Sequence, residues 1–207
     1  MVTAQETVAI IVAGGRSQRM GGGHKALRPL VGRPIVSHIW AIVAPQVAQL
    51  AINVNGPPED FTTLLPGVLV LADAETDHGP LAGVLAGLCW AAQMGASHLL
   101  TIPGDTPFLP SDLVTHMIQS TLCYNATVVC TRSAGNLHPL ISLWNVTLIS
   151  ALAAFLATGN RTVRHFLRTC QYVVVDFATM PLDPFMNMNT LADLMAAERI
   201  AQNFQCL

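Results

Sequence analysis

The hydrophobic positions of the chain form short runs that alternate between the spacing of strands and the spacing of helices. Residues 8–13 are a continuous apolar run that Gly14 ends, which predicts a central strand buried on both faces. Residues 34–45 begin and end with proline and carry Ile and Val at helical spacing, which predicts a helix. The alternation continues with predicted strands at residues 49–54, 68–71 and 98–102, and with predicted helices at residues 61–65, from residue 80, and at residues 111–119 with Ser111 as N-cap.

The second half of the chain is less regular. It predicts strands at residues 126–131, 139–144 and 171–175, and helices at residues 146–156, 163–167 and 191–201. Alternating strands and helices imply right-handed crossovers and a parallel sheet that binds ligands at the carboxyl ends of its strands. A chain of 207 residues can bury most of its apolar surface in a single core. We therefore expect a single α/β domain over residues 1–207, a Rossmann-like three-layer sandwich with a mostly parallel central sheet plus antiparallel additions.

The composition limits the classes of partner. Hydrophobic residues make up 52% of the chain, charged residues only 11%, and the formal net charge is −2. Such a chain has no overall positive field for a polyanion, so we expect neither nucleic acid nor a membrane surface as its partner. Residues 79–104 lack charged side chains, but Pro80, Gly95 and Pro103 interrupt them, which argues against a membrane span. A phosphate ligand must be held by local groups.

Two features favour a cytoplasmic location. The first seven residues carry no positive charge, and the apolar run at residues 8–13 is too short for the core of a secretory signal. The five cysteines contain no C-x-x-C pair, so we expect reduced, buried thiols, as in a reducing compartment.

The loop after the first strand is the strongest chemical signal. It runs through residues 14–25, is rich in glycine, and carries Arg16, Arg19 and Lys25. Glycine allows backbone N–H groups to approach phosphate oxygens, and the three cations supply local positive charge. The loop is not a P-loop, since Ala26 follows the lysine, and it lacks the dinucleotide spacing G-x-G-x-x-G. The alternative is an exposed glycine-rich loop with solvated charges.

A carboxylate follows another predicted strand. Asp105 lies at the carboxyl end of residues 98–102, where it is a candidate ligand for Mg²⁺. This ion takes one or two carboxylates together with substrate phosphates. A turn-forming Asp in a proline-rich corner is the alternative. The basic loop favours the metal site, because the two features together would hold a polyphosphate and a divalent ion.

Other polar residues follow predicted strands or begin helices. We interpret Asp73 as a contact to nucleotide or substrate, while Asn53 and Asn55 could bind a base or ribose, although each is also a common turn former. Arg161 lies near a helix start and suits an anionic second substrate. Asn187 and Asn189 would share one face of a short strand and point toward a site.

These segments in order resemble the molybdenum cofactor guanylyltransferase family. The resemblance runs from residue 8 to the last helix, and it rests on Val12-Ala-Gly-Gly-Arg-Ser-Gln-Arg-Met-Gly-Gly22, Lys25-Ala-Leu, Asn53-Val-Asn55, Gly79-Pro-Leu-Ala-Gly83, Gly104-Asp-Thr-Pro-Phe-Leu-Pro110 and Phe185-Met-Asn-Met-Asn-Thr190. It implies a fold of the nucleotide-diphospho-sugar transferase type and transfer of GMP from GTP to the terminal phosphate of molybdopterin, with Mg²⁺ as cofactor. Proteins of the cofactor pathway or molybdoenzymes would be transient partners.

The resemblance also implies roles for individual residues. Arg19, Lys25 and Asp105 would be catalytic, and Asp105 would hold the metal. The nucleotide would contact Val12, Ala13, Gly14, Gly15, Lys25, Asn53, Asp73 and Asp105. The molybdopterin side would include Gly79, Gly83, Arg161, Asn187 and Asn189. One position departs from the family: the residue before the lysine is usually acidic, and here it is His24.

Other functions remain open at this point. A molybdenum cofactor cytidylyltransferase is the nearest enzyme alternative, but such enzymes usually have Ala-Ala-Gly where this chain has Ala13-Gly14-Gly15. A sugar-phosphate nucleotidyltransferase is a more distant one. A carrier that binds GTP without turnover is the alternative from another class, and His24 motivates it. A scaffolding protein would leave the basic loop, Asp105 and the paired asparagines unexplained.

Overall fold

The fold is built on one seven-stranded sheet. The computed structural model describes residues 3–14, 24–72 and 79–204. The strand order is β5-β4-β1-β6-β8-β7-β9, and a separate two-stranded sheet pairs β2 with β3. In chain order the strands are β1 (Thr7–Val12), β2 (Pro29–Leu30), β3 (Arg33–Pro34), β4 (Gln49–Val54), β5 (Leu69–Ala72), β6 (His98–Pro103), β7 (Val128–Ser133), β8 (Asn136–Asn145) and β9 (Tyr172–Asp176).

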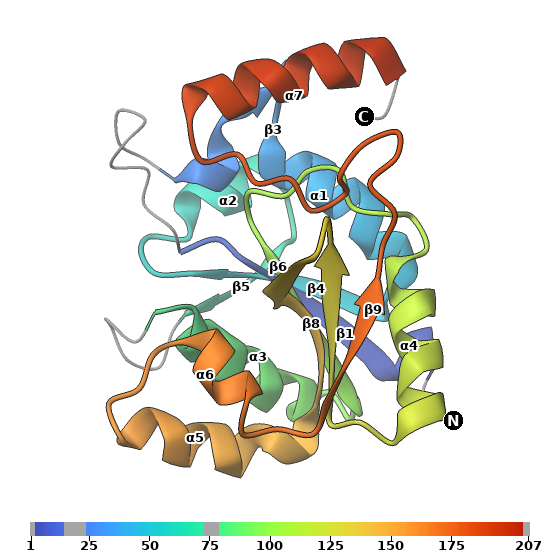
Figure 1. Ribbon diagram of the computed structural model, residues 1–207. Coiled ribbons are helices and arrows are strands. Elements are labelled where there is room, and N and C mark those ends of the chain that lie inside the picture. The colour runs from blue at the N-terminus through green and yellow to red at the C-terminus, as the bar shows by residue number, and fades with distance from the viewer. Residues whose placement is uncertain (1–2, 15–23, 73–78, 205–207) are drawn as a thin grey trace.

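The sheet is mostly parallel, as predicted. β1 pairs in parallel with β4 and β6, β4 pairs in parallel with β5, and β7 pairs in parallel with β9. β8 is antiparallel to both of its neighbours, β6 and β7. The antiparallel addition expected in the second half of the chain is therefore this one strand, which separates β7 and β9 from the rest of the sheet (Figure 1).

Helices cover both faces of the sheet, which gives three layers (Figure 1). Successive residues of β1 point to opposite faces, so Ala9 and Ile11 belong to one core and Val8 and Ile10 to the other. The first core contains side chains of α1 (Ile35–Val43), α4 (Leu113–Tyr124) and α7 (Leu191–Phe204). The second contains side chains of α3 (Pro80–Gln93), α5 (Ile149–Ala157) and α6 (Val163–Leu167). Burial on both faces explains why the first strand reads as a continuous apolar run.

The remaining helical segments are short. They are α2 (Glu59–Leu64) and the 3-10 turns η1 (Ala4–Glu6), η3 (Lys25–Leu27), η4 (Ala44–Gln46) and η5 (Val146–Leu148). Two local predictions were wrong. α4 begins at Leu113 with Asp112 as its N-cap, so Ser111 is not the cap. Residues 185–190 form no strand, since their polar groups bond to loops and to α7 rather than to a neighbouring strand.

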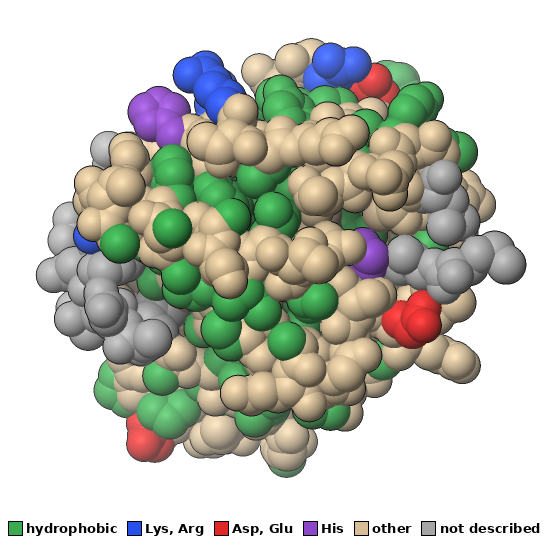
Figure 2. Space-filling view, turned by 90° about the horizontal axis from the view of Figure 1, so that it is seen from below, with side chains coloured by type: hydrophobic (Ala, Val, Ile, Leu, Met, Phe, Trp, Pro, Cys, Tyr) green, Lys and Arg blue, Asp and Glu red, His purple; other side chains and the backbone are tan. Residues whose placement is uncertain are grey.

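Two surface properties bear on the sequence predictions. Within the described ranges, no helix is long and apolar enough to cross a membrane. On the face shown in Figure 2, Lys and Arg side chains lie near the edges rather than in one basic patch.

The described cysteines are free thiols. Among them only Cys130 is buried, and Cys123 is exposed. The prediction that these thiols are buried was therefore wrong for most of them.

Candidate functional site

The ends of three neighbouring strands meet at one edge of the sheet. Val12, the last residue of β1, is in register with Asn53 of β4 and with Pro103 of β6. The pairing continues past the strands, because the Ala13 amide donates to the Asn53 carbonyl at 2.8 Å and the Gly104 amide donates to the Val12 carbonyl at 3.0 Å. Segments separated by about 40 to 90 residues of sequence are thus fixed side by side by backbone hydrogen bonds.

A cavity of about 350 Å³ opens at these strand ends. Its size suits a small-molecule ligand such as a nucleotide. Its walls come from β1, η3, β4, β6, β8 and the start of α3, and the lining residues are Val12, Ala13, Gly14, Lys25, Ala26, Asn53, Asn55, Gly79, Pro80, Pro103, Gly104, Asp105 and Leu140. Eight of the residues that the sequence assigned to a site lie here: Val12, Ala13, Gly14, Lys25, Asn53, Asn55, Gly79 and Asp105.

Lys25 connects three segments of the chain across this cavity. Its Nζ atom donates to Asn189 Oδ1 at 2.6 Å and lies 3.7 Å from Asp105 Oδ2. The lysine side chain is 26% exposed and the Asp105 side chain 16% exposed, so this cation is partly shielded from water. An incompletely solvated cation attracts a phosphate more strongly than a surface lysine does. Lys25 is therefore placed to contact an anionic ligand in the cavity.

Burial dominates the electrostatics of Asp105. Loss of hydration raises the pKa of its carboxyl group above the usual range, and the nearby Lys25 only partly opposes this rise. A buried carboxylate beside a cavity gains from a cation that also binds the ligand. Within the described residues, no group of three or more His, Cys, Asp and Glu side chains could hold a metal. A single carboxylate fits an ion such as Mg²⁺, which takes its other oxygens from phosphates and water.

Gly104, directly before this carboxylate, allows close packing beneath the cavity. A Cβ atom at this position would lie 3.0 Å from the Cβ of Ala26 and 3.3 Å from the Cα of Ala13. Such contacts are tighter than those of ordinary side chains, so any larger residue would push η3 away from β1 and β6. The small residues Ala13, Ala26 and Gly104 therefore keep Lys25 close to Asp105.

Gly83 belongs to the site indirectly. It is buried in α3 and does not line the cavity. A Cβ atom on it would overlap the amide group of Asn53, with the Cγ of that residue only 2.8 Å away. Asn53 is itself buried, and its Nδ2 atom donates to the Leu71 carbonyl at 3.2 Å. Gly83 thus leaves the space in which the Asn53 side chain lies.

The first turn of α3 forms another wall. Gly79 is its N-cap and has a φ of +64°, a conformation that favours glycine, and Pro80 takes the first helical position. Both residues line the cavity, so the positive end of the helix dipole lies at the cavity wall. This orientation favours a negatively charged ligand.

The other residues predicted for the molybdopterin side are placed differently. Asn189 meets Lys25, but Asn187 is exposed and does not line the cavity. The Arg161 guanidinium donates to the carbonyls of Leu156 and Asn160 at 2.9 Å and 3.0 Å, and so caps the end of α5. Its backbone carbonyl lies near Gly79, so Arg161 is at the rim of the site with its charge turned to α5.

Three predicted site residues lie outside the described residues. These are Gly15 and Arg19 of the basic loop, and Asp73 after β5. Arg16 of the same loop lies outside them too. Their assigned roles stay predictions.

His24, the residue that departs from the family, packs beside the site. Its Nδ1 atom lies 3.3 Å from the Ala13 carbonyl oxygen, within hydrogen-bonding distance, and its ring meets the edge of Phe61 with centroids 5.3 Å apart. The imidazole therefore joins the start of η3 to the end of β1 and to α2. A carboxylate could not donate a hydrogen bond to that carbonyl.

Sequence reasoning did not assign Ala26, Pro103 or Leu140 to the site. Ala26 directly follows Lys25, and Pro103 lies two residues before Asp105, so proximity in the sequence could have indicated them. Leu140 reaches the cavity from the antiparallel strand β8, and no motif marks it. Only the order of strands in the sheet brings it there.

Known proteins resemble the chain over almost its whole length. Residues 9–174 match the family model described as the MobA-like NTP transferase domain. The molybdenum cofactor guanylyltransferase of Rhodopseudomonas palustris (strain BisB5) is 44% identical over 199 residues, which cover 94% of each chain. That of Mesorhizobium japonicum is 40% identical over 205 residues, which cover 96% of this chain and 98% of the relative.

Solved structures share the fold at much lower identity. Molybdopterin-guanine dinucleotide biosynthesis protein A from Archaeoglobus fulgidus has a TM-score of 0.75 and 18% identity, and the match covers 96% of this chain and 100% of that one. The 4-diphosphocytidyl-2C-methyl-D-erythritolsynthase from Anaerococcus prevotii also has a TM-score of 0.75, at 15% identity. The match covers 96% of this chain and 97% of that one. The three-layer architecture is thus one that nucleotidyltransferases use.

Proposed function

The chain belongs to the family of MobA-like NTP transferase domains, and we propose on this basis that it transfers GMP from GTP to the terminal phosphate of molybdopterin. The products are molybdopterin guanine dinucleotide and pyrophosphate. Full-length similarity to curated molybdenum cofactor guanylyltransferases supports the substrates. The structural observation that carries the proposal is the cluster of Lys25, Asp105 and Asn189 at a nucleotide-sized cavity.

The reaction needs positioning and charge neutralisation more than proton transfer. An oxygen of the molybdopterin phosphate forms a bond to the α-phosphorus of GTP, and the bond from that phosphorus to the β-phosphate bridging oxygen breaks. The electron pair leaves with pyrophosphate. A phosphate monoester is already ionised near neutral pH, so no general base is required. The protein must hold the two anions together and stabilise the charge that develops on the leaving group.

Different residues of the cavity would bind the nucleotide and neutralise the phosphate charge. The strand ends at Ala13 and Asn53 and the start of α3 at Gly79 would hold the nucleotide. Lys25 would neutralise phosphate charge from a fixed position, because Asn189 and Asp105 orient its ammonium group. We assign Arg19 the same kind of role from the sequence alone.

Asp105 would hold a Mg²⁺ ion at the triphosphate. Its buried carboxylate, whose pKa is raised by loss of hydration, is better accommodated with a divalent cation beside it. When bound, the ion supplies Lewis-acid stabilisation of charge on the transferring phosphoryl group. Because Lys25 lies 3.7 Å from Asp105, an ion held by this carboxylate would add its charge to that of the lysine.

The test is pyrophosphate release by the purified protein with Mg²⁺ and molybdopterin. GTP, CTP and ATP are compared, together with the Asp105→Ala variant and the exposed-residue control Asp60→Ala. We expect release with GTP alone, lost in Asp105→Ala and kept in Asp60→Ala. Preference for CTP would instead make the protein a cytidylyltransferase, and GTP binding without release would make it a carrier.

The same proposal includes the cellular setting. We propose a cytoplasmic enzyme that meets cofactor-pathway proteins or a molybdoenzyme transiently. Cell fractionation with activity assays of each fraction tests the location, and cross-linking in cells that make molybdoenzymes tests the contact. Activity confined to a membrane fraction would contradict this part of the proposal.

A further inference from the structure

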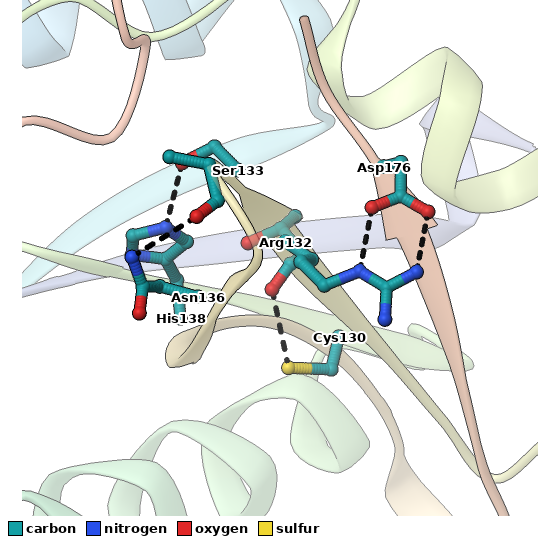
Figure 3. Close-up of polar contacts among 8 residues, drawn as sticks. Cys130, Arg132, Ser133, Asn136, His138 and Asp176 are labelled. Carbon is teal, nitrogen blue, oxygen red and sulfur yellow. Dashed lines mark hydrogen bonds and ion pairs between the residues drawn. The ribbon is translucent and has the colours of Figure 1, made fainter. Parts of the chain in front are cut away.

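Three polar side chains outside the cavity form one hydrogen-bonded chain. Ser133 ends β7, His138 lies in β8, and Asp183 belongs to the loop before α7. The Ser133 hydroxyl donates to Asp183 Oδ1 at 2.7 Å, and its oxygen lies 2.8 Å from His138 Nε2. Figure 3 shows His138 pointing at Ser133, while Arg132 points the other way to Asp176. The three residues join two strands to a loop 50 residues farther along the chain.

The directions of these bonds follow from the chemistry of the groups. A carboxylate only accepts, so the single hydroxyl proton of Ser133 goes to Asp183, and His138 must donate through its Nε2–H. Burial lowers the pKa of His138, which favours the neutral ring, and the charge of Asp183 partly opposes this shift. Ser133 is 1% exposed, so its hydroxyl is shielded from water and would be costly to leave without these partners.

The arrangement is not that of a hydrolytic triad. In such a triad the carboxylate binds the histidine and the serine hydroxyl faces a substrate. Here the carboxylate accepts directly from Ser133, whose hydroxyl is buried. The chain of bonds is therefore suited to holding segments together.

Asp183 fixes the segment that follows it. Its Oδ1 atom also accepts from the Phe185 amide at 3.0 Å, and its carbonyl accepts from the Met186 amide at 3.3 Å. The ring of Phe185 is buried and packs on His138, with centroids 5.0 Å apart. The turn at residues 183–186 is thus held by one carboxylate oxygen and by the histidine that belongs to the same network.

This segment leads directly into the site. The Met188 amide donates to the Asp105 carbonyl at 2.9 Å, and Asn189 accepts from Lys25 at 2.6 Å. A shift of the turn at residues 183–186 would be passed along two or three residues to both contacts. Residues 186–189 have no regular secondary structure, so these side-chain and loop contacts determine where the segment lies.

The same network borders an irregularity in β8. The register with β7 jumps between Cys130, which faces Ser142, and Thr131, which faces His138. Residues 139–141 therefore form a bulge, and Leu140 within it lines the cavity. Bulges commonly redirect side chains near active sites. His138 at the edge of the bulge thus joins the strand that supplies Leu140 to the segment that supplies Asn189.

We infer that Ser133, His138 and Asp183 are positioning residues for the Lys25–Asp105 edge of the site. They set the segment at residues 183–189 so that Asn189 holds the Lys25 ammonium group where it neutralises the reacting phosphates. The inference rests on the proposed function for the identity of those phosphates. The nucleotide side, at the ends of β1 and β4, has no direct hydrogen bond to this network among the described contacts.

Asp183→Ala and Asp183→Asn together test the inference. Both bonds to the side chain use Oδ1, and an asparagine keeps that oxygen, so Asp183→Asn retains the network and Asp183→Ala loses it. We expect Asp183→Ala to lower kcat about tenfold, as a small misplacement of a catalytic group does, and to change KM for GTP by no more than about twofold. Asp183→Asn should resemble the wild type.

Asp176→Ala is the matched control. Asp176 accepts from Arg132, the neighbour of Ser133, at 2.6 Å, but this ion pair is exposed and turned away from the network (Figure 3). Its loss should leave kcat unchanged. Equal kcat values for Asp183→Ala and the wild type, or an equal loss of kcat in Asp183→Asn, would overturn the inference and leave only a contribution to stability.

A second measurement does not depend on activity. Hydrogen–deuterium exchange of the free protein reports whether residues 183–190 are held in place. We expect Asp183→Ala to speed exchange in this segment at least about tenfold relative to α3, and Asp183→Asn to leave it near the wild-type rate. Unchanged exchange in Asp183→Ala would also overturn the inference. If the wild type releases no pyrophosphate, the proposed function fails, while the exchange result still decides the positioning role.

Discussion

The Asn53 side chain lies against Gly83, in space that exists only because Gly83 has no Cβ atom. The two residues belong to β4 and to α3, which packs on the sheet. Asn53 lines the cavity, and Gly83 lies behind it. A glycine that touches no ligand can therefore determine how a ligand-binding side chain is oriented.

Gly83→Ala should weaken nucleotide binding. The added methyl group would displace the Asn53 amide, so we expect KM for GTP to rise by about tenfold or more, since displaced binding groups cost affinity. Gly87→Ala is the control: it lies one turn farther along α3 and meets the core residues Ile10 and Leu99 instead. That variant should lower Tm without changing KM. Steady-state kinetics and thermal unfolding of both variants measure the difference.

Lys25→Ala should reduce turnover by on the order of 10²-fold or more, as the loss of one preorganised charge contact does. The lysine is held by Asn189 and lies near Asp105, so no other described side chain in the cavity takes its place. Pyrophosphate release by the purified variant is the measurement. Arg33→Ala, which removes an exposed cation on β3, should leave the rate unchanged. Full activity of Lys25→Ala would remove this residue from the mechanism.

Asp105→Asn should separate stability from activity. Burial raises the pKa of this carboxyl group, so the folded state accommodates its charge less well than the unfolded chain does. A neutral amide of the same shape avoids that cost, and we expect a higher Tm in the absence of ligand. Activity should fall about 10²-fold, because the metal loses its carboxylate ligand. A lower Tm would mean that pairing with Lys25 outweighs the cost of burial.

His98 should make folding sensitive to mild acid. Its Nδ1 atom contacts Ser97 Oγ at 2.9 Å, and its Nε2 faces Asn145 Nδ2 at 3.4 Å. The Asn145 amide cannot turn over, because its Oδ1 accepts from both the amide and the hydroxyl of Thr147. Protonation at Nε2 would place two N–H donors, one of His98 and one of Asn145, facing each other without an acceptor between them.

The sign of the effect follows from the pKa of His98. Burial lowers this pKa, and the charge of Glu6 only partly opposes the shift. The unfolded chain therefore takes up a proton first, and the free energy of unfolding should fall as the pH drops below about 6.5, the ordinary value for histidine. Above that pH the contribution is fully present. Urea unfolding at several pH values measures how the free energy of unfolding depends on pH. This dependence should be smaller for His98→Gln than for the wild type, and unchanged for His116→Gln, which replaces an exposed histidine.

Asp193→Ala should loosen the start of α7. Asp193 Oδ2 accepts from the amides of Asn189 and Thr190 at 3.0 Å and 2.8 Å, and Thr190 Oγ1 accepts from the Asp193 amide at 3.1 Å. This reciprocal pair is a capping box, and its loss costs roughly 0.5–2 kcal/mol. Because Asn189 is the partner of Lys25, turnover should fall together with Tm. Glu198→Ala on the same helix is the control, and an unchanged rate in Asp193→Ala would show that the cap does not reach the site.

The sequence alone determined the architecture because its signals are local. The apolar run of β1, the proline-bounded α1 and the alternation of strand and helix each follow from a repeat that a few residues display. The carboxyl ends of parallel strands meet at one edge, so the sequence assigns Asn53 and Asp105 to one site, and the family resemblance adds Ala13. Comparison with known families then agrees on the chemistry that this edge supports.

Only the tertiary structure decided which side chains act on one another. Asn189 meets Lys25 across 164 residues of sequence, Leu140 enters the cavity through a bulge, and Arg161 turns its charge to α5 instead of the site. Ser133, His138 and Asp183 carry no motif at all. Such contacts depend on strand order, on register and on the path of residues 185–190, which are fixed by packing and hydrogen bonds between distant parts of the chain. These contacts cannot be predicted from a local repeat. The spacing of hydrophobic residues indicates the helix or strand that each partner belongs to, but not which other element it packs against.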